Sequence, residues 1–159
     1  MDIANNRALL LSEDIIDKKP YDDVSYEEWK KASYRITWAE CSLQKYLNGT
    51  FYESFGKDKE RIEPTPNENP DNPEYGTKGG SRSTDKVFLL SIDEARRYFR
   101  NDNERKAKFN GSGFWWWLRS PGFTQYGAAF VDGDGNVCLG GNPVNFDAGG
   151  VRPALWLDL

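Results

Sequence analysis

Histidine is absent from this sequence of 159 residues. Its absence removes the commonest general base, the commonest metal ligand and the usual pH switch. Cysteine occurs only as Cys41 and Cys138, far apart in sequence, and we interpret both as free thiols rather than a disulfide framework. The sequence therefore indicates no catalytic centre and no metal site, and we expect no cofactor.

Long apolar runs and an excess of basic residues are also missing. No run approaches the roughly 20 apolar residues that cross a bilayer, so we expect no membrane insertion, and no signal peptide is visible. The net charge is −4, from 21 basic and 25 acidic residues, and no segment gathers basic residues, which argues against nucleic-acid binding. We expect a cytoplasmic or virion-associated protein, or one displayed on a surface as part of a longer chain.

Aromatic residues, in contrast, make up 14% of the chain and include six tryptophans. The length favours a single domain over residues 1–159. Helical patterns lie in the first two thirds and strand-like runs in the last third. This order predicts an α+β fold with short helices, a small twisted antiparallel sheet and much irregular loop. Residues 63–85 hold four prolines and three glycines without apolar periodicity, which predicts a long loop insertion.

Local signals place the expected elements. Capping boxes predict two helices, one from Thr37 to Asn48-Gly49 and one from Ser91 to about Phe99. A third short helix is expected over 26–32, and residues 100–110 are expected to form a solvated connection. Apolar runs predict strands at 8–12, 87–90, 115–118, 128–131, 136–139 and 151–157, with a hairpin turn at 132–136.

Two apolar blocks frame the C-terminal third, at residues 114–122 and 150–157. We interpret their tryptophans as packing residues rather than a sugar-stacking platform. We interpret their arginines as donors to carbonyls or carboxylates rather than anion binders. The expected scaffold residues are Trp115, Trp116, Trp117, Arg119, Arg152 and Trp156.

The residues between the blocks, 123–149, are rich in Gly, Asn and Asp with single aromatic rings, and form the candidate binding segment. Rings supply rigid contact area at low entropy cost, and amides supply adaptable hydrogen bonds. The alternative is a pair of ordinary surface loops. The candidate ligand-binding residues are Phe123, Thr124, Gln125, Tyr126, Phe130, Asp132, Leu139, Asn142, Asn145, Phe146 and Asp147.

A calcium loop is a weaker interpretation of residues 132–136. They begin like an EF-hand loop, but Val137 stands where that loop requires glycine and Pro143 where it requires glutamate. A hairpin turn explains the same residues.

Both blocks resemble the marks of a family of bacterial and phage domains, largely of unknown function: a Trp-Trp-Leu-Arg-Ser-Pro-Gly motif, here within 115–122, and a Gly-Val-Arg-Pro-Ala-Leu-Trp-Leu motif, here 150–157. Weaker matches lie at 9–12, 37–52 and 88–95. These domains are similar to the C-type-lectin-like group, which includes formylglycine-generating-type enzymes and variable proteins of diversity-generating retroelements. The resemblance implies a C-type-lectin-like fold and a binding role for a variable segment between the blocks.

Three function classes follow. The first is a non-enzymatic recognition module, in the manner of a retroelement variable protein, for a protein or glycan ligand on a cell or virion surface. The second is a structural or assembly domain of a phage or cell-surface protein. The third is a formylglycine-generating-type enzyme, which needs closely placed cysteines and a copper site, whereas Cys41 and Cys138 are expected in separate elements. The change of composition at Gly122 and again at Gly150 favours the first class.

Overall fold

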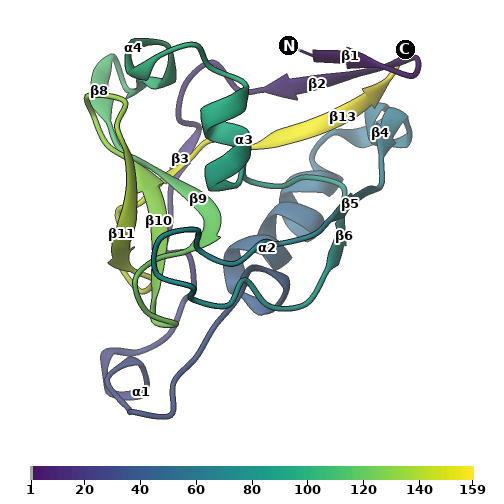
Figure 1. Ribbon diagram of the computed structural model, residues 1–159. Helices are drawn as coiled ribbons and strands as arrows, with labels where there is room; N and C mark the ends of the chain where they lie inside the picture. Colours follow the sequence, from purple (N-terminus) through teal and green to yellow (C-terminus); the bar gives the residue numbers. More distant parts are fainter. Residues whose placement is uncertain (1) are drawn as a thin grey trace.

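The computed structural model describes residues 2–159, and side chains from residue 5 onward (Figure 1). The α+β class is confirmed, but the strands form several small sheets rather than one. The first sheet is antiparallel, in the order β1 (Asp2–Ala4), β2 (Arg7–Leu11), β13 (Ala154–Asp158), β4 (Ile62–Glu63). The second has the order β11 (Val137–Pro143), β10 (Gly127–Val131), β9 (Trp116–Pro121), β12 (Gly150–Val151), β3 (Asp17–Lys18).

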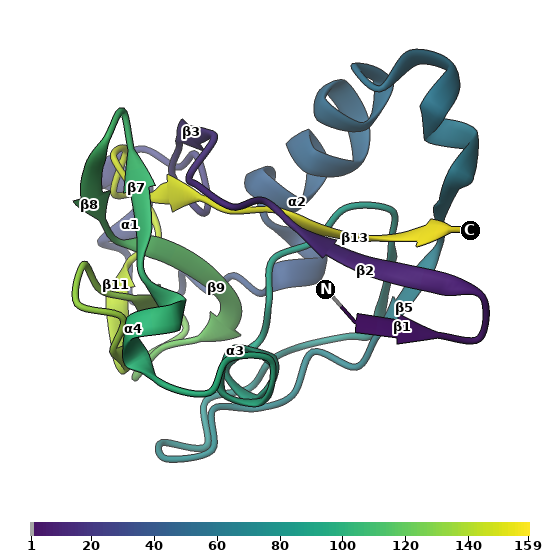
Figure 2. The same ribbon diagram turned by 90° about the horizontal axis from the view of Figure 1, so that it is seen from above.

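The C-terminal block joins these two sheets. The strand expected over 151–157 is interrupted at Arg152-Pro153, so β12 pairs with β9 and β3 in one sheet and β13 pairs with β2 and β4 in the other. Viewed from above, β2 and β13 run side by side while β9 curves past α3 (Figure 2). One short stretch of chain therefore fixes the position of the second sheet relative to the first.

Two two-stranded hairpins complete the strands. β5 (Thr65–Asn67) pairs with β6 (Ser83–Asp85) inside the expected loop insertion, and β7 (Ala107–Phe109) pairs with β8 (Ser112–Phe114). Residues 100–110 are consequently not only a solvated connection. They contain α4 (Asp102–Arg105) and β7, and the guanidinium of Arg105 is buried, where it donates to the carbonyl of Gly135.

The capping box at Ser91 is confirmed. It opens α3 (Ile92–Arg97), where the Ser91 hydroxyl accepts from the Glu94 amide and the Glu94 carboxylate accepts from the Ser91 amide. The helix expected over 26–32 is shorter, and α1 spans Tyr26–Trp29.

The helix expected from Thr37 is wrong in both of its ends. Thr37 makes no side-chain cap, and a 3-10 turn, η1 (Trp38–Glu40), precedes α2 (Ser42–Tyr46), which is capped by the sulfur of Cys41. Asn48-Gly49 does not end it either, since the chain continues as a π-helical turn, η2 (Leu47–Phe51). The helical stretch ends before Gly56, whose φ is +59°, and η3 (Gly56–Arg61) begins at this glycine.

Residues 87–90 are buried and extended but do not form the expected strand. Only Phe88 makes a bridge, to Ala154. Side chains bond several of the other backbone groups: the Asn48 side-chain amide bonds the backbone N–H and carbonyl of Val87, and the Arg119 guanidinium donates to the carbonyl of Leu89. The carbonyl of Leu90 accepts from the backbone amide of Arg119. The segment therefore crosses the core in an extended conformation, and hydrogen bonds from other parts of the chain satisfy its backbone.

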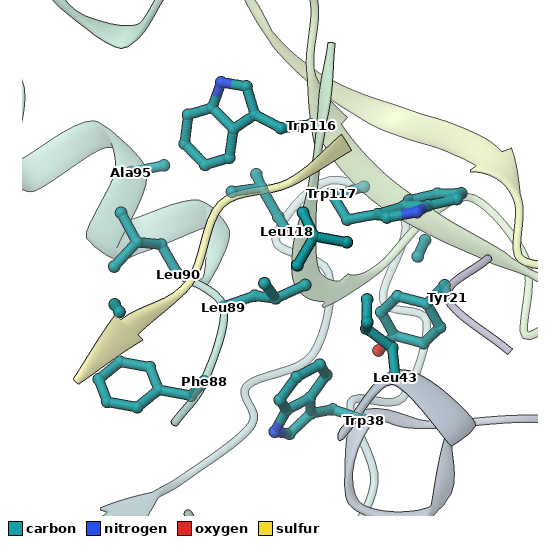
Figure 3. Packing of buried hydrophobic residues seen from close by; sticks show 14 of the residues in the cluster. Tyr21, Trp38, Leu43, Phe88, Leu89, Leu90, Ala95, Trp116, Trp117 and Leu118 are labelled. Carbon is teal, nitrogen blue, oxygen red and sulfur yellow. The ribbon is translucent and has the colours of Figure 1, made fainter. Parts of the chain in front are cut away.

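The core lies where this segment meets β9 and α2 (Figure 3). Trp116, Trp117 and Leu118 of β9 are fully buried. Trp38, from the other side, is 1% exposed and donates through its indole nitrogen to the carboxylate of Asp85 at 2.9 Å. Large rings thus fill the interior, and the backbone of β9 is fixed from both faces.

Candidate functional site

The candidate binding segment is built on the β10–β11 hairpin. Gly127 pairs with Pro143 at the open end of this hairpin, and Val131 pairs with Val137 next to its turn. The candidate residues therefore fall into three groups, of which Phe130 and Leu139 lie within the two strands. Residues 123–126 and 142–147 lie at the open end, which we call the open-end face, whereas Asp132 lies at the turn.

Three aromatic rings project from the open-end face. The exposed fractions are 62% for Phe123, 45% for Tyr126 and 49% for Phe146. Asp147 is exposed as well, and Thr124, Gln125, Asn142 and Asn145 are half-buried. The face thus combines apolar rings with amide and carboxylate groups.

Backbone hydrogen bonds hold this face in position. The Gly122 amide donates to the carbonyl of Gly127 at 3.0 Å, and the Phe123 amide donates to the carbonyl of Gly140 at 2.9 Å. Gly141 permits this close approach, because its φ is +80° and a Cβ there would lie 2.6 Å from the carbonyl oxygen of Ala128. The loops are therefore part of the sheet's hydrogen-bond network rather than loose connections.

The loop insertion at 63–85 packs against the same face. The buried side chain of Asn72 donates from Nδ2 to the carbonyls of Pro121 and Leu139, both at 3.0 Å, and its Oδ1 accepts from the amides of Glu74 and Tyr75. One amide group therefore links the half-buried β11 residue Leu139, the end of β9 and the insertion.

The insertion also adds a ring to the face. Tyr75, which is 43% exposed, meets Phe123 edge-on with ring centroids 4.9 Å apart. The Thr77 hydroxyl donates to the carbonyl of Phe123 at 2.9 Å. This contact could not be predicted, because a proline- and glycine-rich stretch has no periodicity that points to a partner.

The α1 segment is the second contributor that sequence reasoning missed. The Trp29 indole nitrogen donates to the carbonyl of Tyr126 at 3.1 Å, and the two rings meet edge-on at 5.6 Å. The Ile36 amide donates to the carbonyl of Gln125. In Figure 1, α1 lies at the lower end of the molecule, beneath β10 and β11. Tyr26 and Trp29, three residues apart in an otherwise charged stretch, were the available signal.

The tryptophans of the first block differ in their surroundings. Trp116 donates from its indole nitrogen to the carbonyl of Arg105, and Trp117 donates to that of Lys19. Trp115 is only partly buried, and its ring lies 5.2 Å from that of Phe130 and 6.0 Å from that of Phe146. Trp115 thus connects the buried rings with the open-end face.

The remaining scaffold residues lie away from that face. Arg119 is 4% exposed and donates to the carbonyl of Leu89 and to both oxygens of Glu94. Trp156, on β13, is half-buried beneath the guanidinium of Arg7.

Arg152 sits at the crossing between the two sheets. It donates to the carbonyls of Ser12 and Arg105 and stacks over Trp116. Burial lowers the pKa of Arg152 to about 10, although Asp14 and Glu13 act in the opposite direction. The hydrogen bonds of this arginine are therefore made in the interior, and it does not contribute to the open-end face.

Asp132 organises the hairpin turn, which confirms the turn expected at 132–136. Its Oδ1 accepts from the amides of Asp134 and Asn136, both at 2.9 Å. Burial raises the pKa of the Asp132 carboxyl, but hydrogen bonds from Asn136 and Asp134 outweigh it, so that the pKa lies below its usual value. Cys138 lies beside this carboxylate, whereas Cys41 is buried in the core, and both thiols are free.

Among residues 5–159, whose side chains the structure describes, no three Cys, Asp or Glu side chains gather in a metal-binding arrangement. In the same range no helix has the length and apolar character needed to span a membrane.

Comparison with known families gives one match. A family model described as a domain of unknown function (DUF6273) matches residues 5–159, which is nearly the whole chain. No curated protein and no solved structure matches this chain.

Proposed function

We propose that this chain, which belongs to the DUF6273 family of domains of unknown function, is a non-enzymatic recognition module that binds through its open-end face. The observation that carries the proposal is the exposure of Phe123, Tyr126 and Phe146 on backbone that is fixed by hydrogen bonds. Most large apolar side chains of the described residues lie in or against the core, and these three do not.

The physical advantage of this arrangement is preorganisation. Aromatic side chains have few rotatable bonds, so they supply contact area with little loss of entropy on binding. Loops that are already hydrogen-bonded to the sheet lose little further freedom when a ligand arrives. The half-buried Gln125 and Asn142 add hydrogen-bonding groups beside the rings. The proposed ligand is a protein or glycan on a cell or virion surface.

We further propose that the scaffold is C-type-lectin-like and that the open-end face is the variable part, as in variable proteins of diversity-generating retroelements. What supports this is the separation of roles along the C-terminal third. Trp116, Trp117 and Arg119 are buried, whereas the rings between the two blocks project outward. Substitutions at the projecting positions leave the core contacts intact, so many side chains are compatible with one fold. The test is the coding DNA, where an adenine-altered copy of the cassette beside a reverse transcriptase gene is expected.

The binding proposal is tested by removing the rings. We expect the chain to bind a ligand from a glycan array or a library of surface proteins, and the triple variant Phe123→Ala/Tyr126→Ala/Phe146→Ala to bind at least about 100-fold more weakly. The matched control is Ile16→Ala/Leu159→Ala, which removes exposed apolar side chains at 43% and 55% exposure elsewhere. Equal binding by the triple variant and the control would refute the proposal.

An assembly role is the second candidate, because exposed rings also suit a contact between copies of the chain. Sedimentation equilibrium separates the two roles. A monomer that binds a ligand supports recognition, whereas an oligomer that dissociates in the triple ring variant supports assembly.

A further inference from the structure

A cleft next to the open-end face has a lining that the recognition role alone does not explain. Its volume is about 290 Å³, and it lies between the α1 segment and Tyr126. Such a volume is at the small end of ligand pockets, roughly 300–1,000 Å³, and fits one or two ring-sized groups. Its lining includes Trp29, Lys30, Lys31, Tyr34, Arg35 and Tyr126.

The lining is rich in positive charge and contains no carboxylate. Lys30 and Lys31 pair with Glu27 and Glu28 of α1, at 2.6 and 2.5 Å, and these exposed pairs contribute little stability. Arg35 has no acidic partner within 4.0 Å among the side chains of residues 5–159. Two weakly paired ammonium groups and one free guanidinium thus meet at the cleft.

The polar atoms of two lining rings are already engaged. The Trp29 indole nitrogen donates to the carbonyl of Tyr126, and the Tyr34 hydroxyl donates to the carboxylate of Asp22. These rings therefore offer mainly apolar surface. A ligand that fits must carry acceptors for three cations and a flat apolar face for the rings.

We propose that this cleft binds the carboxylate-bearing sugar ring of an acidic glycan, with Arg35 on the carboxylate and the C–H groups of the sugar against the rings of Trp29 and Tyr126. An acidic peptide fits less well, because its carboxylate side chains offer no flat C–H face to the rings and no hydroxyl oxygens to the ammonium groups. Sugar hydroxyls, in contrast, accept from the ammonium groups of Lys30 and Lys31. The inference rests on the proposed function, since it names the ligand class of one part of the recognition surface.

The test uses small probes and the intact chain. Methyl glucuronide, its neutral analogue methyl glucoside, and a hexaglutamate peptide are titrated while the Trp29 indole N–H resonance is followed, identified with Trp29→Phe. We expect saturable shifts with the glucuronide, at least about fivefold weaker binding of the glucoside, and a similar loss for Arg35→Gln. Binding also weakens as salt is raised, because the charged groups are exposed. The control Arg100→Gln alters an exposed arginine elsewhere and is expected to bind normally.

Three results would overturn the inference: no shift with the glucuronide, equal binding of the glucoside, or a preference for hexaglutamate. A parallel variant, Phe123→Ala/Phe146→Ala, lies outside the cleft lining and separates this inference from the proposed function. If this variant loses the screened ligand while the cleft binds no acidic sugar, the inference falls and the recognition role stands. If it retains the ligand while Arg35→Gln loses the glucuronide, the role assigned to the open-end rings falls and the cleft stands.

Discussion

Asn72 offers the sharpest test of how the loop insertion supports the open-end face. The side chain is 2% exposed and donates to the carbonyls of Pro121 and Leu139 while it accepts from the amides of Glu74 and Tyr75. In Asn72→Ala these four bonds are lost. Each contributes about 1 kcal/mol net, and water entering the vacated space restores a part, so we expect the free energy of unfolding to fall by about 3 kcal/mol. For a chain of this size the corresponding fall in melting temperature is about 6–12 °C.

The measurement is equilibrium urea unfolding followed by tryptophan fluorescence. Asn72→Asp provides a second comparison, because it keeps the acceptor for Glu74 and Tyr75 but turns a carboxylate oxygen toward two carbonyls; we expect a loss at least as large. The control Asn103→Ala removes an exposed amide side chain and should change stability by less than about 0.5 kcal/mol. A loss below about 1 kcal/mol for Asn72→Ala would refute the reasoning, because the insertion would then be held by other contacts.

Three further outcomes are expected. Gly149→Ala should lower the free energy of unfolding in urea by about 3 kcal/mol, because its Cβ would lie 1.9 Å from the indole nitrogen of Trp117. The control Gly140→Ala, whose Cβ would have no atom within 4 Å, should change stability little. Similar losses for the two variants would contradict this packing. Asp85→Ala should cost about 3–5 kcal/mol, since four donors lose one buried carboxylate, and a melting temperature close to wild type would argue against that role. Burial raises the pKa of the Cys41 thiol, so stability should fall as the pH rises above the unfolded thiol's value of about 8.5, and Cys41 should react with a thiol reagent only on unfolding. Labelling of Cys41 in the folded Cys138→Ser variant would disprove its burial.

A local sequence pattern was sufficient to predict an element where the hydrogen bonds of that element join residues close in sequence. The Ser91–Glu94 capping box predicted the start of α3 because both of its hydrogen bonds join residues three apart. The same pattern at Thr37 failed. Trp38 is buried in the core, where it bonds to Asp85, 47 residues away, and Cys41 caps the helix in place of Thr37. A distant partner thus overrode a local preference.

Asn48 shows why two other predictions failed together. An Asn-Gly pair such as Asn48-Gly49 is typical of a helix end. Here the side-chain amide of Asn48 bonds the backbone of Val87, and the helix continues past Asn48. The same bond satisfies polar atoms that a strand at 87–90 would have paired in a sheet. Neither result follows from either segment alone, because each requires the other to be in place.

The candidate site could be predicted only in its position between the two apolar blocks. That segment carries the exposed rings Phe123, Tyr126 and Phe146. The contributions of Tyr75 and Trp29 were not predicted, because they reach the face through contacts with chain about 50 and 100 residues away. The sequence also did not separate Asp132 from the open-end face, since register determines which end of a hairpin a residue occupies.

The pairing of β13 with β2 has a practical consequence for tethering. This pairing brings β13 beside the β1–β2 hairpin, and Figure 1 places β1 and the C-terminal end of β13 at the pole opposite α1. A carrier, bead or fluorophore fused at Leu159 would lie at the pole opposite α1, whose Trp29 contacts Tyr126. Immobilisation through that end orients every molecule with its rings toward the solution, so surface-based binding assays sample the intended side.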